Sequence, residues 1–323
     1  MKLKAITAAM LAAGLGLAAC SNAEEADVAT KGQEITIEDN YGDVTIPLPV
    51  ERVASTDNRT FEVLEDWDVP LVAVPKGLLP DTVEAYRGDD VADMGMHREP
   101  DLEALVKAKP DLIISGQRFT QHYEDMKKLN PGVPIVDFEP RDDQDFFEEL
   151  KREVIAMGEI FDKEDDANQL VENFDKAAER AKKAYNGKDT VMAVNVSGGE
   201  IGYIAPNVGR TYGQVFNLLD LKPALEVDGS SSNHEGDDIS VEAIADSDPD
   251  WIFVLDRDGA VNAEKPDYQR ASKVIADSPA LKNVKAIKDD QIVYAPQDTY
   301  VNESIITYTE MLNDIADAFE QKK

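Results

Sequence analysis

One long amphipathic segment in the middle of the chain, residues 162–187, constrains the fold more than any other feature. Its apolar residues recur at the i, i+3, i+4, i+7 spacing of a helix that buries one face, as Leu170, Phe174, Ala181 and Tyr185 illustrate. At 1.5 Å per residue such a helix spans about 34 Å, the width of a small domain. The segment therefore predicts a helix that spans a whole lobe.

The two ends of this segment carry helix signals. Asp162 is positioned to cap the N-terminus, and Asn186 and Gly187 supply a left-handed stop. A comparable pattern of strands and helices precedes and follows the segment. We therefore interpret it as a stiff bridge between two lobes, the alternative being one more helix in a single larger domain.

A repeated unit lies on both sides of the helix. Glu103 opens Glu-Ala-Leu, four residues and Pro-Asp, and Glu242 opens Glu-Ala-Ile, four residues and Pro-Asp, each followed by an apolar run. A helix stopped by proline, a turn and a buried strand fit this order. Two copies predict pseudo-symmetric α/β lobes with mainly parallel central sheets, and a ligand cleft between them at the carboxyl ends of the strands.

The N-terminus has the pattern of an export signal. Two lysines precede a short apolar run that ends in Leu-Ala-Ala-Cys, with Cys20 the only cysteine of the chain. This order is typical of a signal peptide followed by a lipid-attachment cysteine; the alternative is an ordinary signal peptide with an incidental cysteine. The predicted organisation is a signal peptide 1–19, a lipidated flexible tether 20–33, an N-terminal lobe 34–161, the helix 162–187 and a C-terminal lobe 188–323.

The charge balance excludes one class of partner. The formal net charge is −32, which argues against nucleic-acid binding. In so acidic a chain, positive charge gathered in a cleft is informative. Arg118, Arg210 and Arg257 follow predicted strands or precede predicted helices, and three convergent guanidinium groups would suit a polyanion carrying about −3. The alternative is that each is a surface charge.

No catalytic or metal-binding motif is visible. The three histidines, His97, His122 and His234, lack HxH or HExxH spacing. The chain has no GxSxG, Walker or CxxC motif. We expect a binding protein without an intrinsic cofactor, not an enzyme.

Several motifs together resemble the substrate-binding lipoproteins of ferric-siderophore ABC importers, in particular the catecholate-siderophore branch. They are Ala-Val-Pro-Lys at 73–76, Arg-Glu-Pro-Asp-Leu-Glu at 98–103, Ile-Ile-Ser-Gly-Gln-Arg at 113–118, Gly-Arg-Thr-Tyr-Gly at 209–213, Asn-His-Glu-Gly at 233–236 and Phe-Val-Leu-Asp-Arg at 253–257. The resemblance implies a two-lobed, helix-hinged fold of the class III periplasmic-binding type. It also implies a monomer tethered by lipid to the extracytoplasmic face of the cell membrane, with an Fe(III)-siderophore complex as ligand.

The resemblance also implies roles for individual residues. It makes Arg118, Arg210 and Arg257 the lining of the cleft, with Lys76 as a further ligand contact. It makes His234 and Tyr300 candidate iron ligands for siderophores that supply too few donors. It gives Glu103 and Glu242 the task of docking onto the ABC permease. The alternatives are haem, a cobalamin, or a hydroxamate or citrate chelate as ligand, and an extracytoplasmic siderophore esterase.

Overall fold

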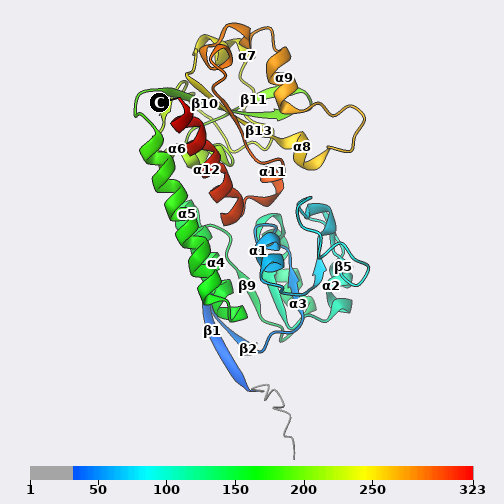
Figure 1. Cartoon of the computed structure of the whole chain (residues 1–323). Coiled ribbons are helices and arrows are strands. Elements are labelled where there is room, and N and C mark those ends of the chain that lie inside the picture. The colour runs from blue at the N-terminus through cyan, green and yellow to red at the C-terminus, as the bar shows by residue number, and fades with distance from the viewer. Residues whose placement is uncertain (1–31, 323) are drawn as a thin grey trace, which may run out of the picture.

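Two α/β lobes, one above the other in Figure 1, are joined along one side by helix α5 (Glu164–Ala184). The computed structural model describes residues 32–322. The predicted signal peptide, Cys20 and nearly all of the tether lie outside these residues. None of the described helices is both long and apolar enough to span a membrane.

The N-terminal lobe is built on a five-stranded sheet in the order β5-β4-β3-β8-β9, with every neighbouring pair parallel. Its strands are β3 (Val53–Ser55), β4 (Leu71–Val74), β5 (Ala92–Asp93), β8 (Leu112–Ser115) and β9 (Ile135–Asp137). Its helices are α1 (Phe61–Asp66), α2 (Leu102–Ala108), α3 (Tyr123–Leu129) and α4 (Phe146–Phe161). Two small antiparallel pairs complete it, β1 (Gln33–Asp39) with β2 (Gly42–Leu48) and β6 (Gly95–Met96) with β7 (Glu99–Pro100). Because Gln33 already pairs with Leu48, the hairpin begins inside the predicted tether.

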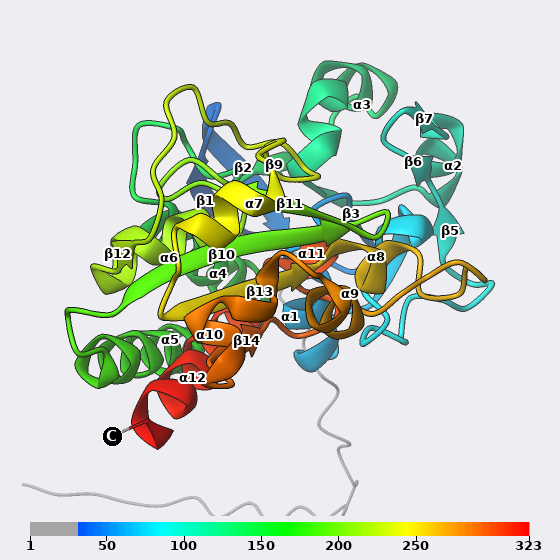
Figure 2. The same ribbon diagram turned by 90° about the horizontal axis from the view of Figure 1, so that it is seen from above.

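The C-terminal lobe repeats this plan with one antiparallel edge. Its sheet runs β11-β10-β13-β14, with β12 also paired to β10, and only the β10–β11 pair is antiparallel. The strands are β10 (Thr190–Ser197), β11 (Glu200–Ile204), β12 (Lys222–Pro223), β13 (Trp251–Asp256) and β14 (Ile292–Tyr294). The helices are α6 (Tyr212–Leu219), α7 (Val241–Asp246), α8 (Arg257–Val261), α9 (Ala271–Asp277), α10 (Lys285–Lys288), α11 (Thr299–Asn302) and α12 (Ile305–Gln321). Figure 2, seen from above, shows β10 and β13 side by side through this lobe. The predicted two-lobed α/β class is confirmed.

The repeated unit folds the same way in both lobes. Its helix is α2 in one and α7 in the other, and its strand is β8 or β13. The Asp111 carboxylate accepts hydrogen bonds from the backbone N–H groups of Glu51 and Arg52, and Asp250 accepts one from Thr190. In each lobe the aspartate of Pro-Asp thus fixes the entry of the neighbouring strand.

The bridging helix is shorter than its sequence pattern predicts. Asp162 does not cap its N-terminus: this residue is left-handed, with φ 57°, and ends α4. The Lys163 N–H then donates to the Gly158 carbonyl at 2.8 Å, which closes α4 before α5 begins. At the other end Tyr185 is already extended, and the left-handed Gly187 lies beyond the helix.

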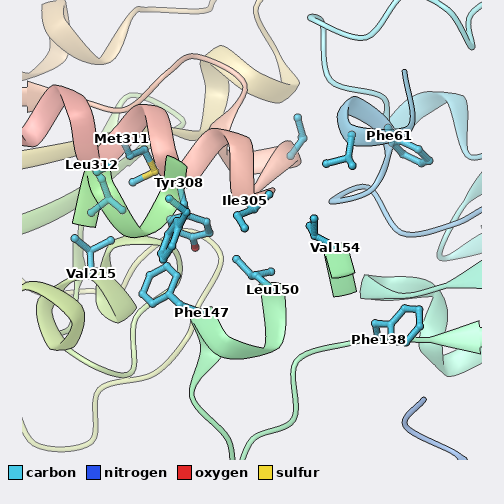
Figure 3. Close-up of a cluster of buried hydrophobic side chains, with 14 of the residues drawn as sticks. Phe61, Phe138, Phe147, Leu150, Val154, Val215, Ile305, Tyr308, Met311 and Leu312 are labelled. Carbon is cyan, nitrogen blue, oxygen red and sulfur yellow. The ribbon is translucent and has the colours of Figure 1, made fainter. Parts of the chain in front are cut away.

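Helix α12 fills the space between the two lobes and the bridge. It packs along α5 and also reaches α4, so its apolar side chains meet those of the N-terminal lobe. Tyr308 lies edge-on to Phe147, with ring centroids 5.1 Å apart (Figure 3). It also lies edge-on to Phe146, at 5.6 Å. Full burial of one such side chain contributes about 1.5–3 kcal/mol. One buried hydrophobic cluster is therefore shared between the lobes.

Candidate functional site

A cavity of about 930 Å³ lies between the lobes and is lined from both. Two carboxylates, Asp81 and Glu264, are found in its lining. The cationic side chains in the lining are Lys76, Arg87, Arg98, Arg118, Arg210, Arg257 and Lys265. A second cavity, of about 890 Å³, lies beside β11 in the C-terminal lobe and has several carboxylates but no cationic side chain in its lining. The interlobe cleft is therefore a positively charged hollow in an acidic protein.

Strand ends bring the three predicted arginines together. Arg118 lies in a short 3₁₀ helix directly after β8, and Arg257 is the first residue of α8, directly after β13. Arg210 precedes α6. Because the carboxyl ends of the parallel strands in both lobes face the boundary between them, these side chains meet in the cleft.

Tyr300 is the point at which the arginines meet. Arg118 donates from Nη2 to the Tyr300 hydroxyl at 3.3 Å. The guanidinium carbons of Arg210 and Arg257 lie 4.4 and 5.3 Å from the centroid of the Tyr300 ring, within the range of cation–π attraction. Tyr300 is only 3 % exposed. Tyr300 lies in the short helix α11.

Arg210 carries its own counter-ion, Glu303, which the sequence analysis did not single out. Arg210 donates from Nε to Oε1 at 3.1 Å and from Nη2 to Oε2 at 2.6 Å, and the Thr211 hydroxyl donates to Oε1. Burial would raise the pKa of Glu303, but the charge and hydrogen bonds of Arg210 outweigh it and hold that pKa below its usual value. Glu303 is thus ionised at neutral pH. It was hard to foresee because it is one acid among 65 and no motif marks it.

The other two arginines differ in their surroundings. Arg257 donates to the Ser197 hydroxyl at 3.0 Å and lies 3.5 Å from Asp258. For Arg118, no carboxylate lies within ion-pair distance among residues 32–322. Of the three guanidinium groups, the charge of Arg118 is therefore the least compensated.

A buried cluster of charged residues lies beneath the cleft. Arg59 pairs with Glu139 at 2.8 Å, and Glu139 also accepts the Gln117 N–H, next to Arg118. Asp57 and Glu153 are buried there, and their carboxyl groups lie within hydrogen-bond reach of each other, a bond that requires a proton on one of them. Burial raises the pKa of Asp57 to about 7, although Arg59 opposes this, and it also raises the pKa of Glu153.

The loop after β8 fits closely over this cluster. A Cβ atom added at Gly116 would overlap the Asp57 carboxylate, so only glycine lets the chain approach. These residues escaped the sequence analysis because they are far apart in the chain. The one available signal was the glycine just before Gln117 and Arg118.

Of the remaining residues predicted to contact the ligand, one lines the cleft and one does not. Lys76 lines the cleft, but its ammonium group donates to the carbonyls of Arg87 and Gly88. His234 does not line the cleft; its side chain is 49 % exposed and lies 3.8 Å from Glu235. The histidine in the lining is His97. Burial and the nearby Arg118 and Arg98 lower the pKa of His97, which keeps its imidazole neutral.

The segment 298–304 links the two lobes across the floor of the cleft. The Thr82 hydroxyl donates to Asp298 at 2.9 Å, and the Asn58 amide donates to the Val301 carbonyl. The Glu62 carboxylate accepts from the Asn302 amide at 2.7 Å and from the Ser304 hydroxyl at 3.2 Å. The chain before and after Tyr300 is therefore held by hydrogen bonds to the N-terminal lobe.

The predicted docking residues occupy equivalent places. Glu103 and Glu242 are each the second residue of their helix, α2 and α7, and both are exposed. Glu103 makes a surface ion pair with Lys107 at 3.4 Å. Such pairs contribute little to stability, and both glutamates lie in the first turn of their helix, where a negative charge favours the helix dipole. Among the described residues, no cluster of three or more His, Cys, Asp or Glu side chains forms a metal site.

Known proteins share this architecture. Petrobactin-binding protein YclQ of Bacillus subtilis is 26% identical, with 99% of this chain and 100% of YclQ covered. Ferric-anguibactin-binding protein FatB of Vibrio anguillarum is 30% identical over 87% of this chain and 85% of its own.

A solved structure of the siderophore-binding protein BauB, bound to a complex between two molecules of acinetobactin and ferric iron, matches with a TM-score of 0.76. It is 25% identical, with 89% of this chain and 99% of BauB covered. The model of a family described as periplasmic binding protein matches residues 53–299. This chain therefore belongs to the periplasmic binding protein family.

Proposed function

We propose that this protein binds an anionic ferric siderophore of the catecholate type in the interlobe cleft and delivers it to an ABC permease. The observation that carries the proposal is the convergence of Arg118, Arg210 and Arg257 on one aromatic ring inside a cationic hollow. Guanidinium groups offer planar donors to catecholate oxygens and flat faces to aromatic rings. The relatives YclQ, FatB and BauB, whose names or descriptions specify siderophores, support this ligand class.

The cleft also supports a direct role for protein atoms at the iron. A siderophore that fills only four coordination positions on the iron leaves two open. The Tyr300 phenol is the oxygen donor at the centre of the arginine triad, which consists of Arg118, Arg210 and Arg257. We assign completion of such a chelate to Tyr300. The resemblance pairs it with His234, whose side chain lies outside the lining, so the histidine positioned to assist is His97.

Binding, not catalysis, is the proposed activity. The cleft holds no nucleophile with a neighbouring base in its lining, which a siderophore esterase would need. Incubation of an ester-linked ferric siderophore with the purified protein should leave the chelate intact. Hydrolysis with turnover would replace the binding proposal by an enzymatic one.

Delivery would use the two lobes together. We propose that Glu103 and Glu242 contact the permease, one from each lobe, and that lipidation of Cys20 keeps the protein at the extracytoplasmic face of the membrane. The equivalent, exposed placement of the two glutamates supports the first part. Mass spectrometry of the mature N-terminus, before and after replacement of Cys20 by alanine, tests the second.

Titration with a panel of ligands tests the main proposal. A ferric tris-catecholate, a ferric bis-catecholate, a ferric hydroxamate and haem are added in parallel, and binding is followed by calorimetry and intrinsic fluorescence. We expect submicromolar binding of the catecholates only. Binding of haem or the hydroxamate alone would keep the fold and change the ligand class.

A further inference from the structure

We propose that Tyr300 is an internal occupant of the arginine triad, and that its exchange with the ligand makes it a residue that selects among ferric chelates. This inference rests on the proposed function and concerns the same cleft. It differs from a role as iron ligand, because it concerns the contacts of the phenol in the empty protein. Displacing the phenol from these contacts lowers the affinity for chelates that need no further donor.

The contacts of Tyr300 are those that a bound catecholate ring would need. Its hydroxyl oxygen accepts an Arg118 N–H at 3.3 Å, across the lobe boundary. Its ring lies against the guanidinium groups of Arg210 and Arg257. An aromatic ring with an oxygen acceptor at its edge is also the recognition unit of a catecholate. In the empty protein, then, the triad is already engaged by a phenol of its own chain.

A ligand ring must compete with the Tyr300 ring for the arginine triad. The guanidinium carbons of Arg210 and Arg257 lie 4.4 and 5.3 Å from the centroid of the Tyr300 ring, so this ring occupies a place beside them that a ligand ring would use. Of the three arginines, Arg118 has the positive charge that is least neutralised by carboxylates. Its charge is therefore the most available to an anionic ligand. A chelate that takes both Arg118 and the guanidinium faces must displace the phenol from them.

The surrounding contacts confine the exchange to the side chain. Val301 and Asn302 are held by Asn58 and Glu62 of the N-terminal lobe, and Glu303 is held by Arg210. With the backbone held on both sides of Tyr300, the phenol leaves the three arginines by rotation of its own side chain.

The consequence is a preference between two classes of chelate. A hexadentate tris-catecholate fills every position on the iron, so it gains nothing from the released phenol and bears the cost of displacing it. A tetradentate bis-catecholate has two open positions and can accept the phenol oxygen. Tyr300 therefore weakens binding of the first class relative to the second.

The Tyr300→Phe variant tests this exchange, since it keeps the ring and removes the bond to Arg118. Calorimetric titration of the purified protein with a ferric tris-catecholate should show at least threefold tighter binding than the unaltered protein. A ferric bis-catecholate should bind more weakly. Tyr294→Phe is the matched control, because Tyr294 lies on β14 outside the cleft lining, and it should change neither affinity.

A second measurement does not depend on the fold of a variant. With 3-fluorotyrosine at position 300 alone, the ¹⁹F resonance should shift on addition of the diamagnetic Ga(III) tris-catecholate, because the phenol leaves Arg118. An unshifted resonance in the saturated complex, or equal or weaker tris-catecholate binding by Tyr300→Phe, overturns the inference and leaves the proposed function standing. Absence of binding by any ferric chelate overturns the proposed function itself, and the inference with it.

Discussion

At the scale of single residues, the sequence indicated the cations of the cleft but not their partners. Arg118, Arg210 and Arg257 could be predicted because strand ends in an α/β protein converge. Glu303 could not, because an acid that pairs with an arginine 93 residues earlier leaves no spacing signal in the sequence, whereas Asp258 directly follows Arg257. The sequence analysis therefore treated three full positive charges as available, whereas two of the three have carboxylates at 2.6 and 3.5 Å.

The arginines differ in what their removal should cost. We expect Arg118→Ala, Arg210→Ala and Arg257→Ala each to weaken binding of a ferric catecholate at least tenfold, about 1.4 kcal/mol, with Arg118→Ala the most severe because its charge is least compensated. Calorimetric titration measures this. Arg270→Ala, an exposed arginine outside the cleft lining, is the control. Unchanged affinity in all three variants would remove the triad from the binding site.

The histidines give a second prediction at this scale. His97 lines the cleft and His234 does not, so His97→Ala should weaken binding of a ferric bis-catecholate at least fivefold while His234→Ala changes it less than twofold. The two variants are matched controls for each other, and thermal unfolding checks that both fold. The reverse result would favour the assignment that the resemblance implied.

At the scale of elements, the sequence predicted most helices and strands but not how they end or what they bury. The sequence pattern predicts a hairpin over residues 34–47, a helix over 145–161 and a closing helix over 304–320. The observed β1–β2, α4 and α12 lie within a few residues of these positions. The boundary between α4 and α5 was expected near Asp162, but this residue ends α4 and does not cap α5, because aspartate is compatible with both positions. Helix α4 also carries Glu153 into the interior, where apolar periodicity alone would place a hydrophobic residue.

The buried acids on α4 and after β3 predict an unusual pH dependence. A carboxyl whose folded-state pKa is raised stabilises the fold below its unfolded value, near 4, and this contribution is lost as the pH rises through the folded value, about 7 for Asp57. Glu153→Gln should therefore raise the free energy of unfolding at pH 8 by at least about 1 kcal/mol and flatten its fall as the pH rises above about 4.

Urea denaturation at a series of pH values measures this effect. Glu103→Gln, an exposed acid on α2, is the control and should leave the profile unchanged. A Glu153→Gln profile that runs parallel to that of the unaltered protein would show that the two buried acids do not retain a proton at neutral pH.

At the scale of the whole molecule, pseudo-symmetry was the most productive prediction from the sequence. The two Glu-Ala-x-x-x-x-x-Pro-Asp units led directly to two lobes, a cleft and an equivalent pair of surface glutamates. The segment 298–304, which ties the lobes together across the cleft floor, belongs to neither repeat and could not be found by comparing them. Symmetry thus predicted the shape of the receptor but not the contacts that hold its lobes together.

The glutamate pair gives the prediction that belongs to this scale. Replacing both Glu103 and Glu242 by alanine should leave the affinity for the ferric ligand within twofold, since both lie outside the cleft lining. It should slow ligand-dependent iron uptake by cells at least fivefold. Replacement of the exposed Glu148 and Glu235 serves as a control for lost surface charge. Normal uptake in the first double variant would exclude these two residues as the permease contact.

The position of α12 also has a consequence for how the protein is made. Phe146 and Phe147 on α4 are covered by Tyr308, which is synthesised roughly 150 residues after α4 is complete. At 5–20 residues per second, that interval is roughly 8–30 s. During this time an apolar face of the first lobe is exposed on the nascent chain. Maturation therefore depends on whatever shields that face until the last helix arrives, and a chain cut short before Ile305 would be left with an open core in both lobes.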